Sequence, residues 1–377
     1  MQQKSTPQKD VLSELKQRQK LDCRYQDGHI LCSMCTKPHP AAKKAYQLFF
    51  ESNLGDQALF PATSQLEQEV ITQLSSLTHS PTSTGFIVSG GTEANLLGLL
   101  AARNHAQKQQ PEVILPESAH FSFNKICGLL NIKPVFAPLD STYRVKSAEA
   151  EKLITRDTVA IVGTAGTAEL GAIDPINELS EIAQKHSIHL HVDAAFGGLI
   201  IPFLKNPPHF DFKLSGVKSL TVDPHKMGMA AIPAGGILLR NPELLDSIKT
   251  ETPYLNSKQH YTFVGTRSGA SAASAWAVFK TLGFEGYKKT INACINNTQT
   301  LTANLKKAGY KLISEPTLNI IAFQTKNPQQ LAQKLSQQGW YVSTIPRYKA
   351  IRIIVMPHVK RHHVTAFLKV LNGIEKF

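Results

Sequence analysis

Residues Ser219-Leu220-Thr221-Val222 form a short apolar run, and Asp223-Pro224-His225-Lys226 follow it directly. Such a run is typical of a buried strand, and a lysine at its end is costly to bury without a chemical reason. Covalent chemistry supplies a reason, because a lysine in a partly desolvated pocket loses its proton readily and becomes a nucleophile towards an aldehyde. We therefore expect Lys226 to be a Schiff-base lysine.

The composition of the chain is that of a globular protein. Of its 377 residues, 42% are apolar and 18% charged, which permits a large core and excludes wholesale disorder. No apolar run approaches the roughly 20 residues that a membrane span needs, and the first twenty residues are polar and basic with no apolar h-region, so we expect no secretory signal. We therefore expect no membrane partner and a cytoplasmic location.

The net charge of +13 invites a nucleic-acid interpretation. The lysines are spread along the chain, however, and their densest pairs fall in helix-like segments, where solvated helix faces account for them. We therefore expect no nucleic-acid partner. The five cysteines are odd in number and scattered, and Cys32-x-x-Cys35 has no second Cys/His pair at a suitable distance, so we expect neither a disulfide framework nor a metal site.

Short apolar runs alternate with helical segments through the middle of the chain. Strands of three to five apolar residues separated by helices of ten or more indicate an α/β fold with a mostly parallel sheet covered on both faces. After about residue 270 the pattern changes to a long helical stretch and a smaller α+β domain. The expected strands of the sheet cover residues 86–89, 113–115, 135–137, 159–163, 189–193, 220–222 and 235–239.

Conspicuous polar residues follow several of these strands. Ligands of such sheets bind beyond the carboxyl ends of the strands, so we expect the polar residues to form one shared site. They are Ser89-Gly90-Gly91-Thr92, Thr164-Ala-Gly-Thr167, Asp193 and His225-Lys226.

The glycine turn before Thr92 is typical of an anion site. Gly90 and Gly91 let the backbone approach a ligand closely, and the following helix start offers free N–H groups, with the Thr92 hydroxyl as a further donor. The spacing is neither that of a Walker A loop nor that of a dinucleotide fingerprint. One phosphate is therefore the expected guest, although such turns are also common as simple helix caps.

Asp193 and His120 have functional and structural interpretations. Asp193, at the end of its strand, could pair with a pyridinium nitrogen and so keep pyridoxal 5′-phosphate (PLP) an electron sink, or could simply cap a turn. His120, at the start of a helix, could stack on the cofactor ring or be a capping histidine. Together with Lys226 and the phosphate turn, they point to PLP.

Several motifs in one order resemble the group II PLP-dependent amino acid decarboxylases, in particular the short tyrosine/aspartate decarboxylases known from methanogens. The resemblance covers nearly the whole chain and implies the aspartate-aminotransferase-like fold (PLP fold type I) and a homodimer with shared active sites. The motifs include Gly28 to Pro40, Asn53-Leu-Gly-Asp56, Ser89 to Asn95, Ala119-His-Phe-Ser122, His191 to Gly198, Asp223-Pro-His-Lys-Met-Gly228, Gly265-Thr-Arg-Ser-Gly269 and Arg352 to His358.

The resemblance also implies a role for each matching residue of the cofactor site. Lys226 carries the cofactor, and His225 contacts the phosphate or assists protonation. Asp193 pairs with the ring nitrogen and His120 stacks on the ring. The phosphate is held by Gly91, Thr92 and, across the subunit boundary, Thr266.

On the substrate side, the resemblance makes Arg352 the clamp for a carboxylate, since a guanidinium fork matches a carboxylate in two hydrogen bonds. An arginine between Ile351 and Ile353 could also face solvent. A loop over the site carries the acid that protonates Cα; we favour Tyr254 over Tyr261, and a tyrosine packed in a loop is the alternative. Residues 56–62 depart from the family pattern, which leaves substrate choice open.

These expectations combine into one function. An N-terminal segment (1–60) contributes to the dimer and active site, a large domain (61–270) binds PLP, and a small domain (271–377) follows. The expected reaction is α-decarboxylation of a small-molecule L-amino acid, either L-aspartate to β-alanine or L-tyrosine to tyramine. The alternatives are another reaction of the same fold (a carbon–carbon lyase or an aminotransferase) and a non-catalytic basic binding protein.

Overall fold

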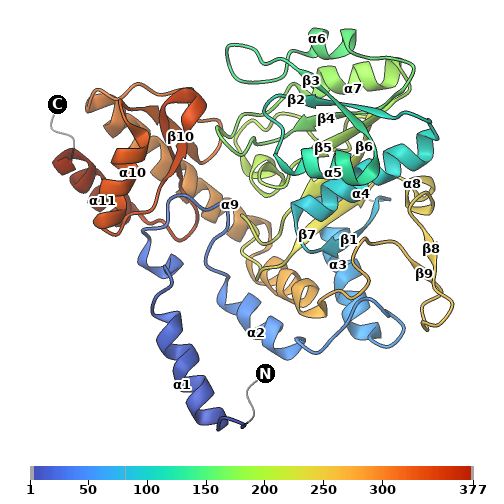
Figure 1. Cartoon of the computed structure of the whole chain (residues 1–377), viewed down its shortest axis with the longest axis horizontal. Coiled ribbons are helices and arrows are strands. Elements are labelled where there is room, and N and C mark those ends of the chain that lie inside the picture. Colours follow the sequence, from blue (N-terminus) through green and yellow to red (C-terminus); the bar gives the residue numbers. More distant parts are fainter. Residues whose placement is uncertain (1–3, 81, 375–377) are drawn as a thin grey trace.

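A seven-stranded sheet forms the centre of the larger part of the computed structural model, which describes residues 4–80 and 82–374 (Figure 1). Its strand order is β1-β7-β6-β5-β4-β2-β3. β7 is antiparallel to both of its neighbours, and the other pairs are parallel, as predicted. The strands are β1 (Thr84–Val88), β2 (Glu112–Pro116), β3 (Lys133–Ala137), β4 (Thr158–Thr164), β5 (His189–Asp193), β6 (Val217–Val222) and β7 (Gly235–Leu239).

Side chains pack on both faces of this sheet, and on β2 alternate residues enter two different apolar clusters. On one face, Val113 and Leu115 of β2 pack with α4 (Gly91–Ala106), α5 (Ser122–Leu130) and α8 (Pro242–Asp246). On the other face, Ile114 of the same strand joins a cluster with α3 (Pro61–Leu77) and α7 (Ile176–Lys185). α6 (Ser147–Lys152) lies near α7. The sheet is thus the middle of three layers.

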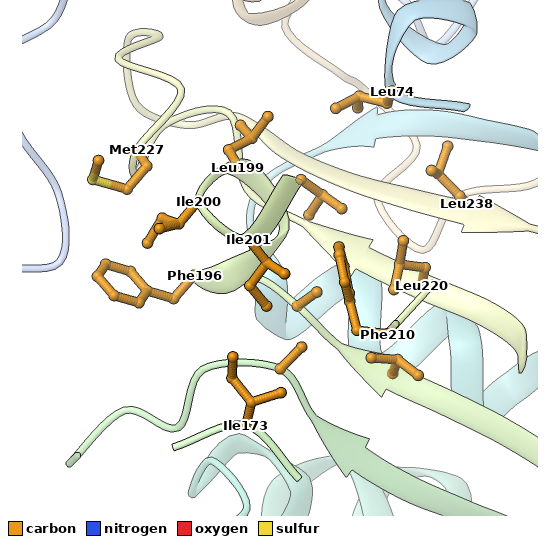
Figure 2. Packing of buried hydrophobic residues seen from close by; sticks show 14 of the residues in the cluster. Leu74, Ile173, Phe196, Leu199, Ile200, Ile201, Phe210, Leu220, Met227 and Leu238 are labelled. Atoms are coloured by element: carbon orange, nitrogen blue, oxygen red, sulfur yellow. The ribbon is translucent and has the colours of Figure 1, made fainter. Parts of the chain in front are cut away.

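The second cluster also supports the segment that carries Lys226. Figure 2 shows Leu199, Ile201 and Phe210, which follow β5, beside Leu220 and Leu238 of the sheet. Met227, the residue after Lys226, is buried in the same cluster. The short helical turns Gly197–Leu199 and Ile201–Phe203 belong to this packing. The apolar side chains of this cluster therefore anchor the backbone next to Lys226.

The smaller domain holds an antiparallel sheet of order β10-β12-β11. α10 begins with the Asn327 side chain accepting a hydrogen bond from the Gln330 amide and with Pro328 in the first turn, a favourable helix start. Its elements are β10 (Ile320–Gln324), α10 (Pro328–Gln337), β11 (Ser343–Ile345), the turn Pro346–Tyr348, β12 (Ala350–Ile354) and α11 (Arg361–Ile374).

The N-terminal segment contacts this smaller domain. The Leu31 amide donates to the Tyr341 carbonyl (2.8 Å), and the Leu31 carbonyl accepts from the Ile354 amide (2.8 Å). Before it lie α1 (Gln8–Gln19) and the turn Tyr25–Asp27, and after it α2 (Pro40–Leu48). α1 buries no residue and stands away from both sheets in Figure 1.

One long helix, α9 (Gly269–Lys307), links the two domains. It bends at Gly283, whose backbone is non-helical (φ 55°, ψ −172°). Residues up to Cys294 pack on the large core, whereas Leu301 and Leu305 pack on the small one. The predicted boundary at residue 271 falls in the first turn of this helix, so the three-part division stays a proposal.

A two-stranded hairpin, β8 (Thr250–Glu251) and β9 (Gln259–His260), extends from the large domain. In Figure 1 it projects beside β1 and α8. Within residues 4–80 and 82–374, no helix combines the length and apolar character needed to cross a membrane.

Candidate active site

A cavity of about 290 Å³ lies at the carboxyl ends of β4, β5 and β6. Six of the residues predicted for the cofactor site line it: Gly91, Thr92, His120, Asp193, His225 and Lys226. The wall is completed by Met34, Ser89, Gly90, Asn95, Thr164, Gly166, Ala168, Ala195, Phe196 and Asp223. The strand ends therefore converge as the sequence pattern indicated.

Lys226 is paired with a buried carboxylate. Its Nζ lies 3.2 Å from Oδ2 of Asp223, a side chain that is 1% exposed. The same oxygen accepts a hydrogen bond from the Gly91 amide (3.1 Å), while Oδ1 has no partner in the described part of the chain. The Lys226 amine is therefore not only partly removed from solvent but also paired with a negative charge, which Asp223 supplies.

His225 is held in one tautomer. Its Nδ1 accepts a hydrogen bond from the Ala234 amide (3.0 Å), so the neutral ring carries its proton on Nε2. Burial lowers the pKa of His225, which favours the neutral form at physiological pH. Nε2 lies 3.6 Å from Asp223 Oδ2, beside Lys226. The side chain therefore offers the cavity one N–H donor.

Asp193 is a buried carboxylate without a cationic partner. Oδ1 accepts from the Ala195 amide (3.1 Å) and Oδ2 from Asn95 Nδ2 (2.9 Å). Within residues 4–80 and 82–374, no lysine or arginine forms an ion pair with it. A buried charge of this kind is stabilised by a cationic ligand.

The start of α4 provides a cradle for an anion. Gly91 is required there, since an added Cβ would lie 2.9 Å from Asp223 Oδ2 and 3.1 Å from the Ala195 Cβ. The amides of Thr92 and Glu93 have no hydrogen-bond acceptor among the described residues. Free amides at a helix N-terminus bind anions well.

His120 is held by its own helix start. Its Nδ1 faces the Ser122 hydroxyl (2.8 Å) and accepts from the Ser122 amide (3.3 Å). Burial lowers the pKa of His120, so the ring is neutral where it lines the cavity. An uncharged ring in this position can stack on a planar ligand.

Three predicted site residues lie outside the cavity wall. Arg352 is just behind it: Nη1 donates to the carbonyl of Ala168 (2.8 Å), a lining residue, and Nη2 to that of Cys32 (3.0 Å). Arg352 is partly buried and both terminal nitrogens of its guanidinium are engaged, which argues against a freely solvent-facing side chain, and its role as a clamp stays a prediction. Thr266 is exposed, and Tyr254, in the β8–β9 loop, is 86% exposed.

The sequence pattern assigned no role to three lining residues, although Thr164 was among the polar residues expected at the shared site. Asp223 stood inside the quoted motif, but only its distance to Lys226 shows its importance. Thr164 is buried at the end of β4, and its hydroxyl has no hydrogen-bond partner among the described residues. Asn95, on the second turn of α4, contacts Asp193 through packing that no sequence spacing indicates.

These residues fit PLP. The cavity joins an amine on Lys226, an unpaired carboxylate at Asp193, a neutral ring at His120 and free amides at α4. The model of the pyridoxal-dependent decarboxylase conserved domain matches residues 50–326. The chain belongs to the pyridoxal-dependent decarboxylase family.

The relatives of this decarboxylase match it along nearly its whole length. It is 46% identical to the L-aspartate decarboxylase of Thermococcus kodakarensis, covering 99% of each chain. It is 51% identical to the probable L-tyrosine/L-aspartate decarboxylase of Methanothermobacter thermautotrophicus, covering 93% of this chain and 98% of the relative. A PLP-dependent amino acid decarboxylase is therefore the established class.

Solved structures agree on the fold. The sphingosine-1-phosphate lyase of Burkholderia pseudomallei superposes with a TM-score of 0.92 at 25% identity, covering 99% of this chain and 91% of the other. The Lactobacillus brevis glutamate decarboxylase superposes at 0.91 with 22% identity, covering 99% and 93%. The predicted PLP fold type I is confirmed.

Proposed function

We propose that this decarboxylase removes the α-carboxyl group of L-aspartate to give β-alanine, and that L-tyrosine is its second substrate. The observation that carries the proposal is Arg352. Its guanidinium is largely buried behind the cavity wall, its Nε has no partner, and no carboxylate of the described residues forms an ion pair with it. Burial lowers the pKa of Arg352, as expected for a cation that lacks an anion. The side-chain carboxylate of L-aspartate, which L-tyrosine lacks, supplies that anion. The relatives named for L-aspartate support the same choice.

PLP, when bound, supplies an electron sink for the bond to the departing carboxylate. The residues of the chain bind and orient. Lys226 holds the cofactor aldehyde through its amine, and Asp193 keeps the ring nitrogen protonated. His120 stacks on the ring, the α4 start with Gly91 and Thr92 holds the phosphate, and His225 Nε2–H donates to the phosphate or assists protonation.

We propose Tyr254 as the group that delivers the proton to Cα. Tyr261 is already engaged, since its hydroxyl donates to Gln259 Oε1 (2.6 Å) and its ring stacks on Phe86 with centroids 5.6 Å apart. Tyr254 has neither constraint and is on a hairpin loop that can close over a site. Closure would also exclude water from the reacting group.

We further propose a homodimer with active sites shared between subunits. Apolar side chains on α1 and α2 are exposed, among them Leu15 (56%) and Leu48 (80%). Thr266 is exposed as well, where it could contact the partner's phosphate. The N-terminal segment 1–60 would then contribute to the dimer. The five free cysteines are in keeping with a cytoplasmic, reducing location.

The experiment is a comparison of initial rates with L-aspartate, L-tyrosine and L-glutamate, for wild type and Arg352→Met. The proposal predicts that L-aspartate is turned over fastest and that Arg352→Met raises its KM more than it lowers kcat. A faster rate with L-tyrosine, and equal loss with both substrates in the variant, would reject the assignment of Arg352 and L-aspartate.

A further inference from the structure

A row of buried polar side chains lies behind Asp193, between α4 and the sheet. His189, His191 and Asp193 are alternate residues of β5, so they face the same side. On β6, Ser219 pairs in register with His191 and Thr221 with Asp193. Five polar side chains are buried here, Asn95, His189, His191, Ser219 and Thr221, and none lies in the wall of the cavity except Asn95.

α4 leaves space for the His191 imidazole at Gly98. Gly98 lies one turn after Asn95 on α4, and a Cβ there would be 2.4 Å from His191 Nδ1 and 3.1 Å from Ser219 Oγ. Both groups are buried, so a larger residue at position 98 would clash with the His191 ring. The glycine therefore serves the polar row rather than a turn.

The direction of each hydrogen bond in this row follows from chemistry. A carboxylate can only accept, so the Asn95 group at 2.9 Å from Asp193 Oδ2 is its NH2. Asn95 Oδ1 then accepts from the Thr221 hydroxyl (2.7 Å) and from His191 Nε2 (2.9 Å), which must carry the proton.

The row continues in the same direction beyond His191. A neutral ring protonated on Nε2 has a bare Nδ1, which accepts from the Ser219 hydroxyl (2.7 Å). That hydroxyl has only one proton, so His189 Nε2, at 2.6 Å, donates to Ser219 Oγ. Burial lowers the pKa of His191 to about 4 and that of His189 well below its ordinary value, so both rings are neutral at pH 7.

We propose that His189, Ser219, His191 and Asn95 form a one-directional hydrogen-bond chain that holds Asp193 ionised and aimed at the ring nitrogen of PLP. Every donor points towards Asp193, and hydrogen bonds in such a row polarise one another. The four are positioning residues, because they act through Asp193 and not on the reacting atoms. This inference rests on the proposed role of Asp193.

The first test needs neither cofactor nor substrate. Histidine labelled with ¹⁵N in the protein without PLP reports which ring nitrogen of His189 and His191 carries the proton, with signals assigned by the two single His→Gln variants. The chain predicts Nε2–H for both. Ser219→Ala removes the acceptor of His189 Nε2–H and should mix the tautomers of that ring, whereas His191 should keep its proton on Nε2 because Asn95 Oδ1 still accepts from it. Thr221→Val, a matched loss of one hydroxyl from the same strand, should leave both rings unchanged. A proton on Nδ1 of His191 in wild type overturns the proposal.

The second test measures the consequence at Asp193. Asn95→Leu should weaken PLP binding by about tenfold, the loss of one hydrogen bond to a charged group. It should also shift the ¹⁵N signal of labelled PLP towards an unprotonated ring nitrogen, which a packing defect would not do. Unchanged affinity and ¹⁵N signal reject the chain. The predicted tautomers without any amine product would instead reject the proposed function alone.

Discussion

A buried ion pair beneath the 265–268 segment makes a quantitative prediction. Arg267 Nη1 donates to Glu67 Oε1 and to the Ile87 carbonyl (2.7 Å), and Nη2 donates to Glu67 Oε2 and the Leu54 carbonyl (3.2 Å each). The two side chains are 6% and 2% exposed. Arg267→Met leaves the Glu67 carboxylate buried with only neutral donors, which should cost about 3–5 kcal/mol of unfolding free energy.

The same helix offers a matched control. Glu69, on the exposed side of α3, faces Lys280 at 3.6 Å, and these side chains are 37% and 53% exposed. Solvent screens such a pair, so Lys280→Met should leave stability nearly unchanged. The assay is urea unfolding of the protein without PLP at one pH, with equal m-values required for the comparison.

The reasoning also predicts non-additivity. Glu67→Gln combined with Arg267→Met removes both charges, and the double variant should be less destabilised than the sum of the single ones. If the urea midpoint of Arg267→Met is no lower than that of Lys280→Met, the claim that breaking this pair leaves Glu67 as an uncompensated buried charge is refuted.

Three further predictions follow from single contacts. If Tyr254 serves the partner's site, mixing inactive Lys226→Ala and Tyr254→Phe chains should restore part of the activity, because each mixed dimer has one intact site; no recovery after verified subunit exchange contradicts shared sites. The Asp56 carboxylate accepts from the amides of the loop at positions 256 and 257 (3.1 Å each), so Asp56→Ala should speed proteolysis between β8 and β9 and lower kcat more than it raises KM; unchanged cleavage would argue against this anchor. Burial lowers the pKa of His358 to about 4, whereas a histidine of the unfolded chain binds its proton near pH 6.5. The free energy of unfolding should therefore fall by up to about 3 kcal/mol as the pH drops from 6.5 to 4. The urea midpoint of His358→Gln should fall less over that range, and an equal fall would reject the assignment.

Much of the fold could be predicted from the alternation of short apolar runs with helices. Strand ends were predictable for the same reason, and they place Gly91, Asp193 and Lys226 around one cavity. The roles of these residues in binding PLP stay predictions, because their place in the cavity wall does not by itself show which group each one binds. The sequence pattern of β7 gave no sign that it runs antiparallel between β1 and β6, since strand direction depends on connections that periodicity does not report.

The contacts that the sequence left open all join distant segments. The Asn95–His191 contact depends on the register of β5 against β6 and on the space above Gly98. The Arg352 contacts depend on two loops meeting behind the cavity. Likewise, α9 bends at Gly283 and packs on both apolar cores, which no composition pattern reports. The predicted boundary at residue 271 lies in its first turn, and the three-part division stays a proposal.

Product stoichiometry tests the central claim most directly. Purified protein with PLP is incubated with L-aspartate and no keto acid, and CO₂ and β-alanine are quantified together. The account predicts equal amounts of both, and none from Lys226→Ala under the same conditions. Consumption of L-aspartate without CO₂, or a requirement for a keto acid acceptor, would contradict it.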